Sequence, residues 1–371
     1  MLPETILVTN KANIRYFSNF AGTAGHVVLH KGHGFLFTDA RYHLVAKAVL
    51  PRSYTLIDTT AGFMEAWKTF IKSHKIRNVG FEGNDVTVHF LETLKKNSGG
   101  GTPRPGGGVK LSDVGDELSK KRMIKTSDEL KKIKKAQDIT DTIFAILKRW
   151  LAPGVSEKEV AWKIECLAHE LGAEGVSFPA IVGINEHSAA PHHHPGEQKL
   201  KRGDMILIDM GVIYQGYCSD MTRVLFTKQP TKLQEEVYEL VHRAQETAIK
   251  KLHAGVKGKE IDGVARGVIR VVKHTPLRGG VGHTALARGG YAKYFTHSLG
   301  HGVGLEVHEL PNLSQRYTDT IPAKSVVTVE PGIYLEGKFG VRLEDMVVVT
   351  AGGARNLTKS PKNLRECILR W

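Results

Sequence analysis

Apolar side chains recur at helical spacing in three long segments of the second two thirds of the chain. Thr126 with Glu129, and Ser156 with Glu159, match the capping-box pattern that opens a helix. Each pair precedes a stripe of apolar residues three and four positions apart, and a third stripe runs over 233–252. This period predicts three amphipathic helices. The β-rich segments between and after them predict an antiparallel sheet with long helices on one side, an α+β arrangement.

The first part of the chain shows shorter alternations. Apolar runs at 26–30 and 35–38 flank a glycine-containing turn, which indicates a β-hairpin. Helical spacing over 63–71 and a short apolar run at 79–81 add a helix and a strand. The pattern predicts a smaller α/β domain.

Two glycine-rich stretches, 98–108 and 275–288, are expected to be loops because they hold no regular apolar pattern. A boundary is predicted near Lys125, dividing the chain into domains 1–124 and 125–371. A chain of 371 residues has room for two such domains.

Composition excludes several classes of protein. The formal charge of +14 comes from scattered basic residues, so a nucleic-acid partner is not expected. The three cysteines lack CxxC spacing and indicate neither a disulfide framework nor a zinc knuckle. No signal pattern and no membrane-length apolar run is present, and the expected location is the cytoplasm.

Four carboxylates and one histidine carry the candidate chemistry: Asp209, Asp220, His301, Glu330 and Glu344. Each acid lies at the end of an apolar run, where an uncompensated carboxylate is costly to bury. Any one of them alone could be a surface acid at a strand end. All four together, with a Gly-His-Gly sequence around the histidine, indicate that cations neutralise them.

The two pairs of acids are predicted to lie on two hairpins. The first pair is equidistant from a point between Tyr214 and Gln215, and the second pair from Gly337. Residues equidistant from a hairpin turn stand opposite each other, so each pair is expected to be roughly opposed across its own hairpin. The two segments also share a faint internal similarity, which suggests two similar hairpins that face one another.

The types of donor atom limit which metal ions this site suits. Four carboxylates and one imidazole are mostly oxygen donors, too many for a single zinc and too hard for copper. Two ions of manganese, cobalt or zinc with bridging carboxylates would hold a water as hydroxide near neutral pH. Such a site is equipped for metal-assisted amide hydrolysis.

At these residues the sequence resembles the pita-bread metallopeptidases: methionine aminopeptidase, prolidase and aminopeptidase P. The resemblance rests on DMGVIYQGYCSDMTR, HSLGHGVGLEVHE, VEPGIY, GVRLED and PHHHPGEQKLKRGD, which cover most of 180–346. The N-terminal NIRYFSNF and FTDARYH resemble the creatinase/prolidase N-terminal domain. Methionine aminopeptidases generally lack such a domain, and creatinases do not keep all five metal positions. The resemblance therefore implies a proline-directed peptidase that is commonly a homodimer.

The resemblance also implies roles for the five metal positions. Asp209 would chelate one ion, and His301 with Glu330 would hold the other. Asp220 and Glu344 would bridge both ions. Two divalent ions are implied, with manganese favoured and cobalt or zinc as alternatives. Glu330 would also act as the proton shuttle for the bridging hydroxide that attacks the peptide bond.

Four further residues match positions that contact the substrate in the family. His308 would support the oxyanion of the tetrahedral intermediate. His192 would contact the substrate, although a slip of one register would put one of its neighbours 193–194 there. His297 would line the proline pocket, and Arg342 would orient the carboxylates. Without the resemblance, a lone histidine such as His192 or His297 is more often an ordinary polar residue, and the simpler alternative for Arg342 is an ion pair with Glu344 or Asp345.

The expected substrate is a peptide with proline in second position. Prolidases often carry an arginine shortly after the second histidine, which holds the free carboxylate of a dipeptide. Asn312 occupies that point here, which favours an aminopeptidase P-like reaction, unless Arg278 or Arg288 replaces the cation. Xaa-Pro dipeptidase is the alternative. A non-catalytic module that binds protein or nucleic acid is the rival of another class, disfavoured because all metal positions are kept.

Overall fold

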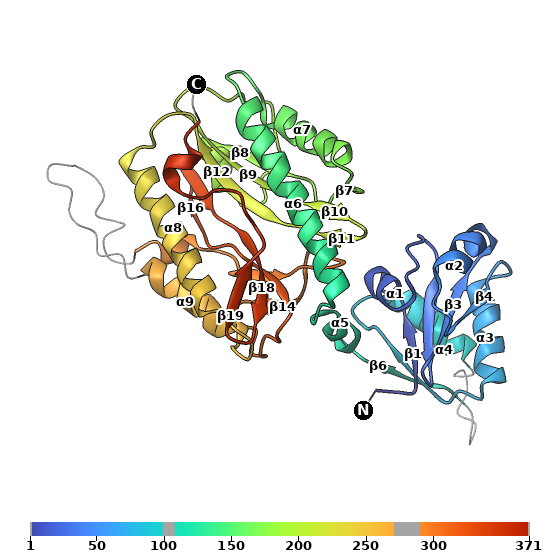
Figure 1. Ribbon diagram of the computed structural model, residues 1–371. Helices are drawn as coiled ribbons and strands as arrows, with labels where there is room; N and C mark the ends of the chain where they lie inside the picture. Colours follow the sequence, from blue (N-terminus) through green and yellow to red (C-terminus); the bar gives the residue numbers. More distant parts are fainter. Residues whose placement is uncertain (1, 99–107, 271–289, 370–371) are drawn as a thin grey trace. The chain divides into compact units, whose positions relative to one another are not determined.

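The computed structural model describes residues 2–98, 108–270 and 290–369. The chain divides into two compact units, residues 1–122 and 123–371, each described here by itself (Figure 1). The predicted loop at 275–288 lies outside the described residues, as does the predicted loop at 98–108 apart from its two end residues.

The N-terminal unit is built on one six-stranded mixed sheet with the order β4-β3-β2-β1-β5-β6. Its strands are β1 Thr5–Val8, β2 His26–His30, β3 His33–Thr38, β4 Tyr54–Asp58, β5 Asn78–Phe81 and β6 Lys110–Asp113. Its helices are α1 Lys11–Ser18, α2 His43–Val49, α3 Phe63–Ser73, α4 Val88–Asn97 and α5 Glu117–Arg122.

Both faces of this sheet are buried, as the residues of β1 show. Ile6 and Val8 belong to one apolar cluster, whereas Leu7 belongs to a second cluster that contains Trp67 of α3. Successive side chains of a strand point to opposite faces, so helices must cover the sheet on both sides. The predicted α/β unit is confirmed, including its hairpin β2–β3.

Four long helices belong to the C-terminal unit: α6 Ser127–Trp150, α7 Glu157–Glu170, α8 Lys232–Lys251 and α9 Gly258–Arg270. The two predicted capping boxes are present, with the hydroxyls of Thr126 and Ser156 accepting hydrogen bonds from the N3 backbone. Thr231 forms a third capping box with Gln234 at the start of α8. The first three helices confirm the predicted stripes, and α9 is an addition.

Short antiparallel sheets carry the site in this unit, and every pairing between its described strands is antiparallel. The strand orders are β11-β10-β7, β12-β9-β8, β14-β13-β15-β18-β19 and β16-β17. The first strands are β7 Gly175–Val176, β8 Ile181–Ile184, β9 Met205–Met210, β10 Val212–Tyr214, β11 Tyr217–Cys218 and β12 Met221–Phe226. The later strands are β13 Gly300–Gly302, β14 Glu309–Leu313, β15 Val326–Val329, β16 Gly332–Leu335, β17 Phe339–Arg342, β18 Asp345–Thr350 and β19 Gly353–Asn356.

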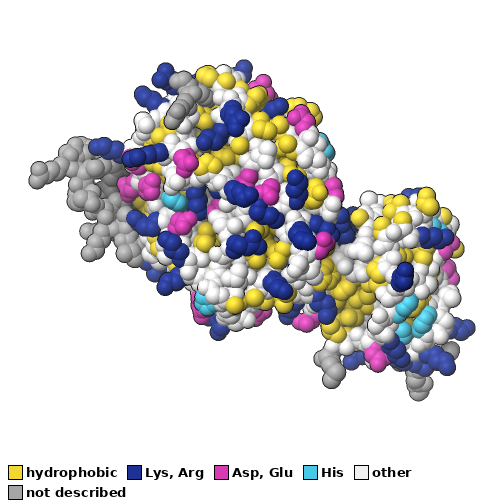
Figure 2. Space-filling model, viewed as in Figure 1, with side chains coloured by type: hydrophobic (Ala, Val, Ile, Leu, Met, Phe, Trp, Pro, Cys, Tyr) yellow, Lys and Arg dark blue, Asp and Glu magenta, His cyan; other side chains and the backbone are white. Residues whose placement is uncertain are grey.

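A large apolar core joins the helices of this unit to its strands, which confirms the predicted α+β class. On the face shown in Figure 2, Lys and Arg side chains are scattered among acids and do not gather into one stripe. Within the described residues, no helix combines the length and the apolarity that a membrane crossing requires.

Candidate metal centre

The first two acids lie on one long hairpin, but they are not directly opposed. Asp209 on β9 pairs with Thr222 on β12, and Asp220 lies two residues before Thr222 on the same face. The predicted rough opposition of Asp209 and Asp220 takes a diagonal form, and the predicted centre of the hairpin is one residue too early. The turn consists of Gln215 and Gly216, both with positive φ, so the partner of Asp209 lies two positions further along the second strand. The two carboxylates are diagonal neighbours, still within reach of one ion.

The second hairpin has the predicted register. Val329 pairs with Asp345 across β15 and β18, and Gly332 pairs with Arg342 across β16 and β17. Both pairings place Glu330 level with Glu344. Gly337 at the turn has a φ of 68°, a conformation that glycine adopts without a steric penalty.

Polar side chains join the two hairpins at the acids. The hydroxyl of Thr222 donates to Oε2 of Glu344 at 2.7 Å. Nη2 of Arg342 donates to Oδ2 of Asp209 at 2.5 Å. Each bond connects the first hairpin to the second, so all four acids meet at a common centre. The internal similarity of the two segments therefore corresponds to two facing hairpins.

His301 reaches this centre from β13. An added Cβ at Gly300 would lie 2.1 Å from the carbonyl oxygen of Thr328, so only glycine allows this close approach of β13 to β15. The backbone amide of His301 donates to the Thr328 hydroxyl at 3.0 Å. Its Nε2 then lies 3.2 Å from Oε1 of Glu330 and 3.6 Å from Oδ2 of Asp220.

The buried acids of the centre repel one another, and this repulsion shifts their pKa values. Burial, and then the charges of Glu344 and Asp209, raise the pKa of Asp220 well above its ordinary value. Burial and the charge of Glu330 do the same to the pKa of Glu344. Burial would also raise the pKa of Glu330, but the hydrogen bond and charge of His301 lower it to about 2. The repulsion is of the kind that divalent ions remove.

The residues present fit a pair of divalent cations. Oδ1 of Asp209 and Oδ1 of Asp220 are buried and have no hydrogen-bond partner among the described residues. Ligand atoms of Asp220, His301 and Glu344 lie within 4.8 Å of one another. Buried carboxylate oxygens normally find donors, so two without any point to missing cations. The donor set of four carboxylates and one imidazole suits divalent ions.

A cavity of about 540 Å³ opens onto the acids. Its walls include the predicted contact residues His192, His297 and His308, together with Asn312. The His308 ring lies edge-on to the His301 ring, with 4.3 Å between their centroids. One side is apolar, formed by Phe178, Pro179 and Ile181.

Arg342 contacts one of the acids, Asp209, and several neutral acceptors. Its guanidinium also donates to the Thr222 hydroxyl at 2.9 Å, to the Tyr334 hydroxyl at 2.8 Å and to the Pro191 carbonyl at 3.5 Å. It forms no ion pair with Glu344 or Asp345 in the described residues, so that simpler interpretation of Arg342 is wrong.

Two residues of this network, Thr222 and Tyr334, were missed by sequence reasoning. Tyr334 also contacts Nε2 of His297 at 2.8 Å. The only sequence signal was strand parity: Tyr334 lies four residues after Glu330, and Thr222 two after Asp220.

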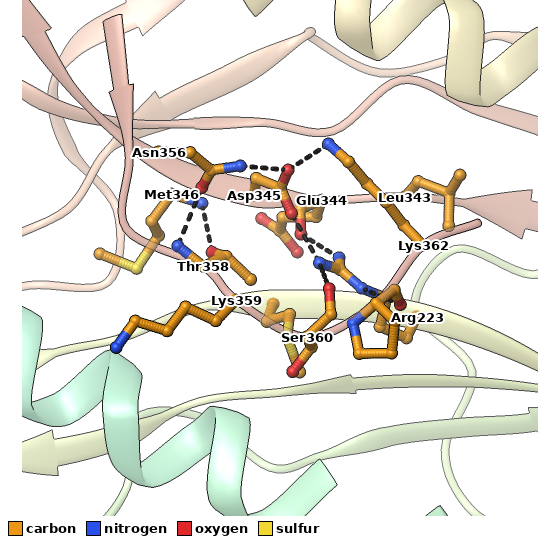
Figure 3. Close-up of polar contacts among 12 residues, drawn as sticks. Arg223, Leu343, Glu344, Asp345, Met346, Asn356, Thr358, Lys359, Ser360 and Lys362 are labelled. Atoms are coloured by element: carbon orange, nitrogen blue, oxygen red, sulfur yellow. Dashed lines mark hydrogen bonds and ion pairs between the residues drawn. The ribbon is translucent and has the colours of Figure 1, made fainter. Parts of the chain in front are cut away.

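A second buried network supports Glu344 from its backbone (Figure 3). Nη1 of Arg223 donates to the Glu344 carbonyl at 2.6 Å and to the Thr222 carbonyl at 3.0 Å. Its Nη2 donates to Oδ1 of Asp345 at 2.7 Å, and Lys362 pairs with the other oxygen. Arg223 thus holds the main chains of the two hairpins together at Glu344.

Family models match both units of this chain. The model of metallopeptidase family M24 matches residues 131–351, and the model of the creatinase/prolidase N-terminal domain matches residues 4–124. An uncharacterized peptidase, YqhT of Bacillus subtilis, is 34% identical over 361 residues, which are 97% of this chain and 95% of the relative. The Xaa-Pro dipeptidase of Pyrococcus horikoshii is 34% identical over 364 residues, 97% and 94% of the two chains.

Solved structures agree with the family models. The Xaa-Pro dipeptidase from Bacillus anthracis superposes with a TM-score of 0.87 at 34% identity, covering 97% of this chain and 94% of the other. The X-Pro aminopeptidase from Thermotoga maritima has a TM-score of 0.83 at 35% identity, covering 97% and 96%. The expected fold, a pita-bread domain preceded by a creatinase-type domain, is confirmed.

Proposed function

This chain belongs to metallopeptidase family M24, and from that premise we propose that it hydrolyses the peptide bond before proline in short peptides. The observation that carries the proposal is the convergence of four acids and His301 on a cavity, with two buried carboxylate oxygens that lack donors. The printed names of its relatives supply the substrate class, because several are Xaa-Pro peptidases.

The metal ligands would be Asp209, Asp220, His301, Glu330 and Glu344. The chemistry that two divalent ions supply there is activation of water and polarisation of the scissile carbonyl. Glu330 would take up the proton of the attacking water, and in the chain without ions the hydrogen bond and charge of His301 lower its pKa to about 2.

The cavity residues would bind the peptide. Burial and the charge of His301 lower the pKa of His308, so at neutral pH its ring is uncharged and can donate one N–H to the developing oxyanion. His297, tied to Tyr334, and His192 would contact the substrate. The apolar wall formed by Phe178, Pro179 and Ile181 suits a proline ring.

Two substrate lengths are separate candidates. The names of the relatives favour the dipeptide Xaa-Pro over the longer peptides that the sequence favoured. Cleavage of Xaa-Pro-Yaa is the second candidate, because Asn312 lines the cavity where prolidases often carry an arginine for the dipeptide carboxylate. In the described lining, Arg342 is the one Lys or Arg side chain, and Asp209 already neutralises it.

We further propose manganese as the working metal, and a cytoplasmic homodimer as the assembly. Reconstitution of metal-stripped protein with manganese, cobalt and zinc tests the metal. Sedimentation velocity tests the dimer, and a monomer at micromolar concentration contradicts it.

Hydrolysis of Ala-Pro, Ala-Pro-Ala and Ala-Ala by metal-loaded protein tests the function. Cleavage of Ala-Pro alone supports the dipeptidase, and cleavage of Ala-Pro-Ala at the first bond supports the aminopeptidase. Activity should vanish with chelator and return with metal. Absence of cleavage of both proline peptides by protein that holds two ions per chain would show that the proposal is wrong.

A further inference from the structure

A second cluster of titratable side chains lies beside the cavity and outside the metal centre: Glu157, His187 and His193. Glu157 is the first residue of α7, and its side chain is fully buried. His193 belongs to the run of three histidines at 192–194 that lines the cavity.

The carboxylate of Glu157 accepts four hydrogen bonds. Oε1 accepts from the backbone amide of Ile184 and from Nδ1 of His187, each at 2.8 Å. Oε2 accepts from the backbone amide of Gly196 at 2.8 Å and from Nε2 of His193 at 2.9 Å. Hydrogen bonds to an ionised acceptor are strong, and four of them leave this carboxylate little freedom.

The partners of Glu157 lie at both ends of one segment, residues 184–196. Ile184 ends β8, whereas Gly196 follows the histidine run, so one buried charge anchors the whole connection to α7. Backbone bonds strengthen the anchor, because the amide of Glu157 donates to the carbonyl of Gln198 at 3.1 Å.

The distances indicate a hydrogen-bonded cluster and not a third metal site. Glu157 and its two histidines are 2.8 and 2.9 Å apart, as donors and acceptors are. In the metal centre the corresponding contacts of His301 are 3.2 and 3.6 Å, and two carboxylate oxygens there have no partner. Each oxygen of Glu157 also holds a backbone amide.

The cluster sets His193 apart from its two neighbours in the histidine run. Nε2 of His193 is committed to Glu157, whereas the His192 and His194 rings are exposed and make no hydrogen bond to any residue of the described chain. Of these two open rings, His192 is the one whose charge acts on His308, and both of these side chains line the cavity. His192 is therefore the open ring close to His308.

We propose that Glu157, His187 and His193 form a positioning clamp that holds the 184–196 segment so that His192 faces the substrate. The proposal rests on the proposed peptidase function. Glu157 and His193 are positioning residues that act through His192: Glu157 is fully buried, and Nε2 of His193 is held by Glu157 although its ring lines the cavity.

Peptide kinetics test the clamp through its coupling to His192. Glu157→Gln should lower kcat/KM about 10- to 100-fold, as loss of a supporting residue does, while the protein still holds two ions per chain. In a His192→Ala background the same change should cost less than about twofold, because the group that it positions is gone. Equal losses in both backgrounds, or loss of metal from Glu157→Gln, would overturn the clamp.

Matched variants separate positioning from folding. His193→Gln places an amide N–H near the position that Nε2 of His193 occupies, so it should retain activity within about threefold. His193→Leu has no donor there and should lose as much activity as Glu157→Gln. Glu159→Ala is the control, because it removes the capping box at the same helix start without touching the histidines. Its thermal midpoint should fall while its kcat/KM stays that of the parent. A low activity in Glu159→Ala equal to that of Glu157→Gln would contradict positioning.

A measurement on the histidines themselves decides the clamp even if no peptide is cleaved. Ring ¹⁵N spectra should show a protonated Nδ1 at His187 and a protonated Nε2 at His193, both slow to exchange with solvent. Both signatures should disappear in Glu157→Gln. Averaged tautomers in the parent protein, or a third tightly bound ion per chain, would show that the cluster is no clamp.

Discussion

Side chains around the metal centre differ in how closely they depend on a cation. Asp220 is buried beside other acids and has an oxygen without a donor among the described residues, which supports its proposed role as a metal ligand. His308 is exposed to the cavity and contacts His301 only through ring edges. Residues so close together therefore have separable effects on metal binding and on catalysis.

Asp220→Ala should lose both metal and activity, whereas His308→Ala should keep both ions and lose about 10²- to 10³-fold in kcat. The reason is that Asp220 is proposed as a metal ligand and His308 as a donor to the reacting carbonyl. Metal content by mass spectrometry together with peptide kinetics measures the difference. Equal metal loss in the two variants contradicts the role given to His308.

His26 in the N-terminal unit makes stability depend on pH. Its ring packs against Phe63 and Phe90, and its Nδ1 is buried with no hydrogen-bond partner among the described residues. Burial lowers the pKa of His26 to about 4, against an ordinary 6.5. Between these values the unfolded chain binds the proton and the folded unit does not, so stability falls as pH falls from 6.5 to about 4.

The loss of stability from His26 amounts to on the order of 3 kcal/mol. His26→Phe should remove that part of the pH dependence, because phenylalanine fits the same aromatic contacts and binds no proton. Calorimetry of the N-terminal unit's transition at pH 7.5 and pH 4.5 measures it. An unchanged difference between the two pH values in the variant would refute the assignment to His26.

Contacts between the two hairpins position the proposed metal ligands. The two hairpins are joined by Thr222, Arg342 and Arg223, and each of these spans from one hairpin to the other. Arg223 is itself buried, and the carboxylate of Asp345 compensates its positive charge. This network determines where the backbone of Glu344 lies.

Asp345→Asn should destabilise the C-terminal unit by about 3–5 kcal/mol, because it leaves the buried Arg223 without its counter-charge. It should also weaken metal binding about 10- to 100-fold through Glu344. Asp138→Asn is the control, since it breaks pairs with the half-buried Lys134 and the exposed Lys359 and should cost at most about 1 kcal/mol. Similar metal affinity in both variants would show that Arg223 does not support Glu344.

At the scale of the whole molecule, two units with separate cores share one chain. The N-terminal unit has its own apolar clusters on both faces of its sheet, and the metal centre belongs to the C-terminal unit alone. Metal should therefore stabilise one unit and not the other.

Calorimetry with and without chelator tests this separation. Removal of ions should lower only the transition of the C-terminal unit, by about 2.7 kcal/mol where free metal was 100 times its Kd. The N-terminal transition should not move. A shift of both transitions by the same amount would show that the units unfold as one.

The sequence alone was sufficient for three of the long helices and the class of each unit, and it selected the five residues proposed as ligands, because helix caps, apolar periods and strand-end acids are local signals. It also placed Glu330 opposite Glu344, since a single glycine turn centres that hairpin. The pairing of Asp209 was decided by the positive φ of two turn residues, which moved the register to Thr222. Only the tertiary structure showed that Arg342 binds Asp209, that Arg223 supports Glu344, and that Glu157 holds His193. Those partners lie 36 to 133 residues apart, and no local pattern connects them before the chain has folded.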